Sequence, residues 1–267
     1  MKASESNPNY PSKVREMTNY TIREIKKVCK DIGPRPSGEE NERKAQDYVA
    51  DSMSKVADSV VKEKFELHPK AFMGWVPLDV ILMTISIVLT LLSYFDVLPS
   101  ASTAFSVVSV VLTSLAIIFT FFEFLLYKKF LDPFFPKRET YNVVCTRKAA
   151  GETKRRIVFS GHIDSAYEWY FTHLGGGKLL TTMIALAFGA IAITLAASIV
   201  SFFDVPNGVR VTAIVVLFVC LIPILMCSKF VNWKLCVPGA NDNLTGVFAS
   251  MSVLRYMAAN DIRFENT

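Results

Sequence analysis

The sequence predicts an α/β domain into which two membrane-spanning helical hairpins, about four helices in all, are inserted. Hydrophobic residues make up 51% of the 267 residues and the mean hydropathy is +0.33, as expected of a chain with soluble and membrane parts. Four long segments are apolar all round, whereas helices that cover a soluble core are amphipathic. Between these segments helical and strand-like patterns alternate, which is typical of an α/β domain.

The four apolar segments are long enough to span a membrane. Each has about 18–25 residues, which at 1.5 Å per residue crosses a hydrocarbon core of about 30 Å. The short connections DVLPSAS and DVPNGVR join them in pairs. Asp79 and Glu123 stand at span ends, where snorkelling explains a carboxylate more simply than a proton path does. The predicted spans are Leu78–Phe95, Phe105–Tyr127, Leu179–Phe203 and Val209–Cys227.

These hairpins, at 78–127 and 179–227, divide the polar domain into three stretches: 1–77, 128–178 and 228–267. Basic residues flank the spans on the side that these stretches share, whereas the two short connections hold only Arg210. The positive-inside rule therefore predicts an integral protein of the cytoplasmic membrane whose polar domain faces the cytosol. The flanking basic residues are Lys128, Lys129, Lys137, Arg138, Lys178, Lys229 and Lys234.

Charge and cysteine content exclude several classes of protein. The formal net charge of +5 is mild, and no basic run is interleaved with aromatic residues, so we expect no nucleic-acid partner. The five cysteines are scattered and form no Cys-x-x-Cys pair. This pattern predicts neither a disulfide framework nor a cysteine zinc site.

Three amphipathic helices are predicted in the polar domain. Residues 19–33 have apolar side chains at helical spacing, including Ile22, and Gly33 is expected at the C′ position. Residues 34–56 form a second helix, for which Ser37 and Glu40 predict a capping box. Residues 241–260 place the apolar side chains Leu244, Val247, Phe248, Met251, Leu254 and Ala258 on one stripe.

Strands are predicted at 60–67, 141–148 and 155–161, and residues 262–267 have the pattern of the start of another. The segment 155–161, RRIVFSG, is nearly continuous in apolar residues. Such a run predicts a parallel strand that is covered on both faces.

His162 and Asp164 follow that predicted strand directly, in the sequence GHIDS. Side chains two residues apart on a strand point the same way, and open α/β sheets bind ligands at the carboxyl ends of their strands. An imidazole beside a carboxylate is a common zinc arrangement. A structural hydrogen-bonded pair is the alternative interpretation.

Asp242 lies in the Gly-containing turn PGANDNLTGV that leads into the last predicted helix. A carboxylate at that place is stabilised by free N–H groups and by the helix dipole, so a plain N-cap is one interpretation. Asn241, Asn243 and Thr245 are likewise ordinary cap and turn residues.

Together the stretches IGPRPSGEENERKAQDYVADSM, YNVV, RRIVFSGHIDS and PGANDNLTGV resemble, in this order, the first half of the M28-family zinc aminopeptidases. The resemblance covers most of the polar chain and none of the spans. It implies a phosphorylase/hydrolase-like zinc-exopeptidase fold with two Zn2+ ions. It further implies that His162 binds one zinc, that Asp242 bridges both, and that Asp164 serves catalysis by orienting His162. A metal-activated water would then attack N-terminal peptide bonds.

The chain departs from the family pattern after Asp242. A Glu-Glu pair that supplies the general base and a zinc ligand, a further acidic residue and a late His are not found before Thr267. We therefore expect a fragment of a longer enzyme with little catalysis of its own, acting on peptides at a lipid membrane. A non-catalytic membrane scaffold and a glutaminyl-cyclase-like enzyme with a single zinc are the alternatives.

The two remaining histidines are not predicted to be ligands. His68, in ELHPK, is expected in a surface loop. His173 and Glu168 are expected at the membrane interface, although they could line a substrate mouth. The run Gly175–Gly177 is expected to be a flexible joint.

Overall fold

The computed structural model describes residues 9–267; residues 1–8, part of the predicted stretch 1–77, lie outside them. The chain forms two compact units. Unit 1 comprises the polar segments up to Leu67, Lys137–Tyr167 and Lys234–Thr267, and unit 2 comprises His68–Pro136 and Glu168–Trp233. Each unit is therefore built from segments that are far apart in the sequence.

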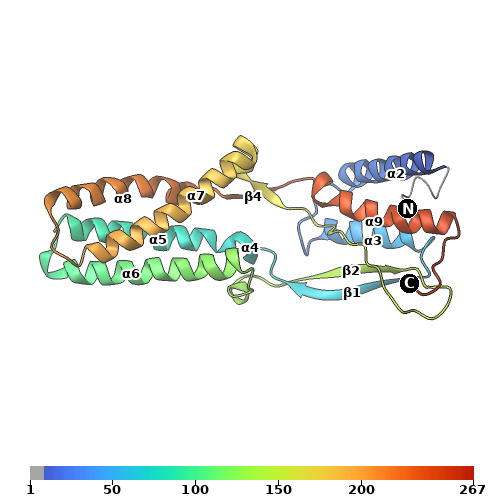
Figure 1. Cartoon of the computed structure of the whole chain (residues 1–267), viewed down its shortest axis with the longest axis horizontal. Coiled ribbons are helices and arrows are strands. Elements are labelled where there is room, and N and C mark those ends of the chain that lie inside the picture. The colour runs from blue at the N-terminus through green and yellow to red at the C-terminus, as the bar shows by residue number, and fades with distance from the viewer. Residues whose placement is uncertain (1–8) are drawn as a thin grey trace. The chain divides into compact units, whose positions relative to one another are not determined.

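Unit 1 is a layered arrangement of three helices and a two-stranded antiparallel sheet (Figure 1). The helix α2 packs on α9, and α3 packs on the sheet formed by β1 and β2. The two strands are antiparallel, with Ser59 opposite Thr146 at one end and Leu67 opposite Arg138 at the other. The elements are α2 (Tyr10–Asp31), α3 (Glu40–Met53), β1 (Ser59–Leu67), β2 (Arg138–Thr146) and α9 (Thr245–Ala259).

The core of unit 1 lies where the predicted apolar faces meet. Val28 of α2, Val49 of α3 and Phe248 of α9 are all buried there. Gly33 takes a left-handed backbone (φ 79°) after α2, and its N–H bonds to the Val28 carbonyl, which confirms the predicted C′ position. Ile22 is 46% exposed, so its assignment to the apolar face of α2 was wrong.

The prediction of strands at 155–161 and 262–267 is wrong, because neither segment pairs with a strand in the described part of the chain. The expected doubly covered parallel strand is instead an extended segment whose apolar side chains Ile157, Val158 and Phe159 are exposed. A run of β-forming residues becomes a strand only where another strand completes its hydrogen bonds.

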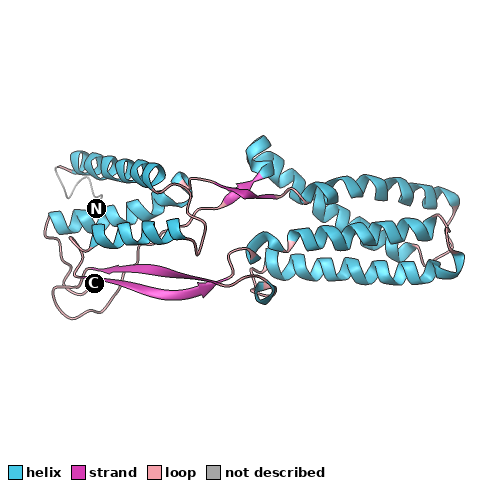
Figure 2. Ribbon diagram, turned by 180° about the vertical axis from the view of Figure 1, so that it is seen from behind, coloured by secondary structure: helices cyan, strands magenta, loops and turns pink. Residues whose placement is uncertain are grey.

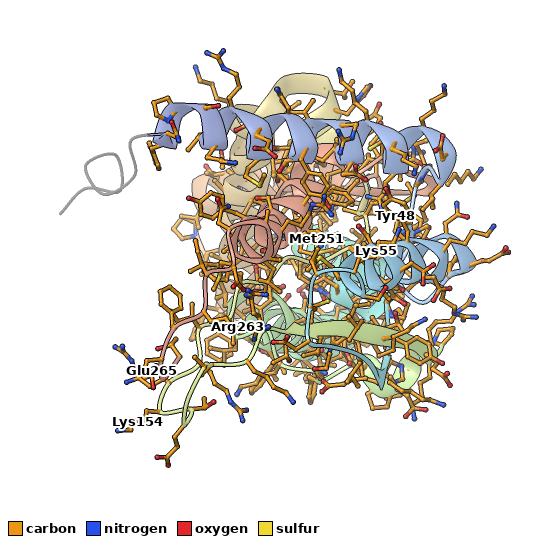
Figure 3. The ribbon with its side chains drawn as sticks, turned by 90° about the vertical axis from the view of Figure 1, so that its right-hand side faces the viewer. Tyr48, Lys55, Lys154, Met251, Arg263 and Glu265 are labelled. Carbon is orange, nitrogen blue, oxygen red and sulfur yellow. The ribbon has the colours of Figure 1, made fainter. Side chains whose placement is uncertain are left out.

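The backbone contacts of that extended segment are few. The N–H groups of Lys154 and Arg155 bond to the carbonyl of Asn266, and Gly151 N–H bonds to the Glu265 carbonyl. Figure 3 shows Lys154 and Glu265 near each other at the outer end of unit 1. These bonds attach the C-terminal segment to the loop after β2.

A second two-stranded sheet, which the patterns did not predict, joins β3 (Tyr167–Trp169) to β4 (Val231–Cys236). Both strands lie next to the ends of apolar helices, and β3 has only three residues. So short a strand leaves almost no period-two signal in the sequence.

Unit 2 is a bundle of helices (Figure 2). Four helical segments are long and apolar enough to cross a membrane: Ala71–Tyr94, Pro99–Leu125, Tyr170–Val200 and Asn207–Cys227. This finding agrees with the four predicted spans. The helices are α4 (Ala71–Gly74), α5 (Val76–Tyr94), α6 (Ser102–Phe119), α7 (Tyr170–Val200) and α8 (Asn207–Cys227), with a π-helical turn η2 (Thr120–Leu125) after α6.

The glycine run lies at a kink within helix α7. Gly175 and Gly176 have non-helical backbone angles, and Gly176 is left-handed with φ 62°. The helix continues on both sides of this break, so the apolar span is preceded by a short helical segment from Tyr170.

Hydroxyl side chains link three helices inside the bundle. Thr90 of α5 bonds to Ser109 of α6 at 2.6 Å and to Ser198 of α7 at 2.8 Å. Ser109 and Ser198 are themselves 2.6 Å apart, and Ser86 bonds to Ser109 at 2.6 Å. Lipid offers no competing hydrogen bonds, so such contacts hold membrane helices together.

Asp79 and Glu123 do not snorkel, contrary to the prediction. Asp79 is 7% exposed and accepts a hydrogen bond from Thr120 at 2.7 Å. Glu123 is 5% exposed and accepts one from the Leu131 backbone N–H at 2.5 Å. Both carboxylates are therefore buried and hydrogen-bonded inside the helical bundle instead of being directed out of it.

Candidate metal centre

Two loops of unit 1 bring His162, Asp164 and Asp242 together. The imidazole Nδ1 of His162 is 3.1 Å from Asp164 Oδ1, and its Nε2 is 3.0 Å from Asp242 Oδ1. Asp242 lies 80 positions after His162 in the chain and the whole second hairpin intervenes. The contact therefore depends on the fold of unit 1 and not on local sequence.

The positions of the two ring nitrogens of His162 determine what must lie between this ring and Asp242. If the neutral ring donates its Nδ1–H to Asp164, the lone pair of Nε2 points at Asp242 Oδ1. Two acceptors 3.0 Å apart repel each other unless a proton or a cation lies between them. The site is therefore chemically suited to a positive charge at Nε2.

Ser37 holds the other oxygen of Asp164. Its hydroxyl donates to Asp164 Oδ2 at 2.5 Å, so both carboxylate oxygens have a partner. The predicted capping box is consequently wrong: α3 begins at Glu40 after the N-cap residue Glu39, and no side-chain cap bond forms. The Ser37 hydroxyl contributes to the site instead of to the helix.

Arg35 ties the two loops together. Its guanidinium is completely buried and donates to the carbonyls of Gly33 at 2.7 Å, Ile163 at 2.8 Å and Gly239 at 3.4 Å. Its backbone N–H donates to the Ser165 hydroxyl at 2.8 Å. Burial lowers the pKa of Arg35, and the nearby Cys29 acts against this shift. Sequence reasoning missed this residue, whose place between two prolines predicts only a loop.

Gly239 permits the close approach of these groups. Its φ of 61° is left-handed, and a Cβ atom there would lie 2.6 Å from Ser165 Cβ and 2.9 Å from Arg35 Nη2. Any other residue would be strained by its backbone and would also clash. Glycine at this position is thus a steric requirement of the site.

The N-cap interpretation of Asp242 is wrong. The helix α9 begins at Thr245, and Asp242 has a non-helical backbone and a side chain that is 76% exposed. The Gly246 N–H is instead bonded to Asn243 Oδ1 at 3.0 Å. Since its neighbour provides this bond, the Asp242 carboxylate is left to face His162.

Glu42 lies beneath the site on α3 and was not predicted. It is 5% exposed and accepts bonds from Gly38 N–H at 2.6 Å and the Thr140 hydroxyl at 2.7 Å. Burial raises the pKa of Glu42, these bonds act against the shift, and the negative charge of Asp164 adds to it. Glu42 is one of several charged residues in the sequence of α3, so nothing in the sequence indicates that its side chain is buried.

The donors fit zinc in kind but not in number. Two ligands about 2.0–2.1 Å from a tetrahedral zinc lie about 3.3 Å apart, so the 3.0 Å between His162 Nε2 and Asp242 Oδ1 is close to a ligand pair. A protein zinc site has at least three protein ligands. Residues 9–267 contain no group of three or more His, Cys, Asp or Glu side chains arranged to hold a metal. These two donors would need further ligands.

The other histidines lie in unit 2 and have other partners. His173 Nδ1 is 3.5 Å from Glu168 Oε2, and His68 Nδ1 is 2.6 Å from the Phe135 carbonyl oxygen. Both histidines can therefore serve as controls in experiments on His162, the histidine of unit 1.

Comparisons of the chain with protein-family models, with curated proteins and with solved structures give no match. The chemical arguments for a function therefore come from the residues and their geometry.

Proposed function

We propose that this chain contributes the first half of a membrane-bound zinc aminopeptidase site of the M28 type. The observation that supports the proposal is His162, held by Asp164 on one nitrogen and facing Asp242 with the other. The resemblance assigns His162 and Asp242 to the metals and Asp164 to the orientation of His162. The order of elements around them, from Arg35 to Asp242, is the order that the resemblance requires.

Each residue of the chain has a separate task in this proposal. Asp164 fixes the ring so that Nε2 of His162 presents its lone pair, and Ser37 fixes Asp164. Asp242, highly exposed, remains free to bind cations. Bound zinc would polarise the scissile carbonyl and lower the pKa of a water. The remaining ligands and the general base would be residues other than those described, since a site of two donors is open.

A non-catalytic scaffold is the second candidate, and one observation favours it. Residues 9–267 contain no group of three or more His, Cys, Asp or Glu side chains arranged to hold a metal ion. A protein that had lost the catalytic residues would retain the fold of unit 1 without binding zinc tightly.

The test is release of N-terminal residues from a panel of short peptides by the full-length gene product, purified with zinc. We expect activity that His162→Ala abolishes, since it removes a metal ligand. His173→Ala, a histidine of unit 2, should leave the activity unchanged. Activity that survives in His162→Ala would refute the assignment, and inactivity of the wild type on the whole panel would favour the scaffold.

A further inference from the structure

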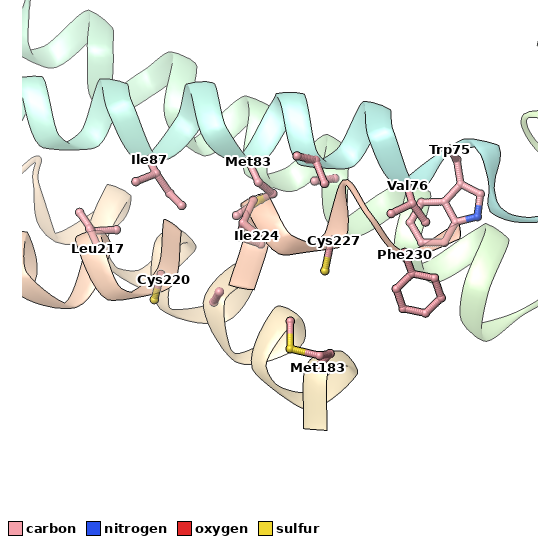
Figure 4. Packing of buried hydrophobic residues seen from close by; sticks show 14 of the residues in the cluster. Trp75, Val76, Met83, Ile87, Met183, Leu217, Cys220, Ile224, Cys227 and Phe230 are labelled. Carbon is pink, nitrogen blue, oxygen red and sulfur yellow. The ribbon is translucent and has the colours of Figure 1, made fainter. Parts of the chain in front are cut away.

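A cavity of unit 2 that is open on one side lies next to the buried carboxylate of Asp79. Its volume is about 70 Å³. Its lining residues come from α5, α7, α8 and the segments next to them, and all belong to unit 2. Figure 4 shows part of this wall, with Trp75 next to Phe230 and with Met83 next to Ile224.

Asp79 is the single charged side chain on the cavity wall. Thr120 donates to its Oδ2 at 2.7 Å, but Oδ1 has no hydrogen-bond partner in the described structure. The side chain is more than nine-tenths buried, and no lysine or arginine of the described chain lines the cavity with it. An unpaired carboxylate oxygen inside an apolar bundle is costly, so a cation or a donor at Oδ1 would be stabilising.

The rest of the wall is apolar and aromatic. The Trp75 and Phe124 rings are 6.4 Å apart, and Phe124 and Phe188 are 6.1 Å apart. Phe230 completes the set of four aromatic side chains. Aromatic faces attract organic cations and also accept alkyl groups. A metal ion, by contrast, requires several oxygen or nitrogen ligands, and this wall provides one carboxylate and one hydroxyl.

We propose that this cavity binds the ammonium group of an amine that carries an apolar body. The ammonium would donate a charge-assisted hydrogen bond to Asp79 Oδ1, and the alkyl part would lie against the aromatic side chains. A free alkylamine and an aminophospholipid share this chemistry. The site is separate from the metal centre of unit 1 and does not depend on the function proposed for it.

The test is the thermal stability of the full chain in neutral detergent micelles, titrated with hexylammonium chloride or with hexanol. Hexanol has the same alkyl chain and a hydroxyl group but no charge, so the comparison of free-ligand affinities isolates the contribution of the charge. The apparent affinity follows from the dependence of stability on ligand concentration. We expect hexylammonium to bind at least about tenfold more tightly than hexanol, as a charge-assisted bond implies.

Two variants test separately the charge of Asp79 and the shape of the cavity. Asp79→Asn keeps the size of the side chain and should abolish the preference for the ammonium. Ala187→Leu keeps Asp79 but fills the cavity, and should abolish binding of hexylammonium even if Asp79→Asn does not fold. Ala185→Leu, on an exposed position of the same helix, is the matched control and should bind as the wild type does.

Equal binding of the two ligands by the wild type would overturn the proposal. A preference that persists in Asp79→Asn, or undiminished binding in Ala187→Leu, would also overturn it. The source of the amine is tested in phosphatidylcholine nanodiscs with and without phosphatidylethanolamine. If phosphatidylethanolamine competes with hexylammonium, the site exists and its ligand is an aminophospholipid. If hexylammonium binds equally well with and without this lipid, the site exists and its ligand is a free amine.

Discussion

Replacement of Gly161 by alanine tests whether the loop that carries His162 is in close contact with the first turn of α9, which follows Asp242. A Cβ atom on Gly161 would lie 2.4 Å from the Val247 amide nitrogen and 2.5 Å from the Gly246 carbonyl carbon. Ordinary contacts of this kind are 3.4–4 Å, so the backbone of one loop must move by roughly 1 Å. Such overpacking destabilises by about 1–3 kcal/mol, and the movement would separate His162 from Asp242.

Amide hydrogen exchange along α9 measures this effect in the full chain. A loss of about 1–3 kcal/mol makes exchange by local opening roughly 5–150-fold faster around Val247. Gly177→Ala is the control, because a Cβ atom there has nothing within 4 Å. Exchange in Gly161→Ala within twofold of the wild type would refute the close contact between the His162 loop and the first turn of α9.

Three further predictions concern unit 1. Arg35→Lys should lower its unfolding free energy by about 2 kcal/mol or more, measured by denaturant titration, because buried carbonyls lose their donors. Burial raises the pKa of Glu42, so the folded state retains this proton and stability falls as pH rises above about 4.3. Glu42→Gln should flatten that slope in unfolding curves between pH 4 and 7. Hydrogen bonds from Arg263 lower the pKa of Asp58, so their stabilisation is present above about pH 3.9 and lost in acid. The difference in stability between wild type and Arg263→Ala should therefore be largest at pH 7 and should decrease as the pH falls below about 3.9.

The helices of unit 1 and the spans could be predicted because their signals are local. Val28, Val49 and Phe248 are buried as helical spacing predicts. Asp79 was misjudged because its burial depends on Thr120, 41 positions away. Hydropathy is averaged over a window of residues along the chain, so it does not indicate a side-chain contact of this kind.

The candidate metal centre could be predicted in part. The positions of His162 and Asp242 could be named from the resemblance, but their partners could not. Arg35 bonds to carbonyls 128 and 204 positions away, and nothing next to it in the sequence indicates this. The strand expected before His162 was wrong because a strand requires a pairing partner, which its own residues do not specify.

The most direct test of the central claim is the response of His68, His162 and His173 to Zn2+, followed by 15N NMR of the full-length gene product with histidine labelled selectively. We expect Zn2+ to shift the Nε2 resonance of His162, which is identified by its loss in His162→Gln. Asp242→Asn should abolish the shift, and the resonances of His68 and His173 should not move. A shift of all three histidines alike, or an unchanged His162, would contradict a metal centre formed by these loops.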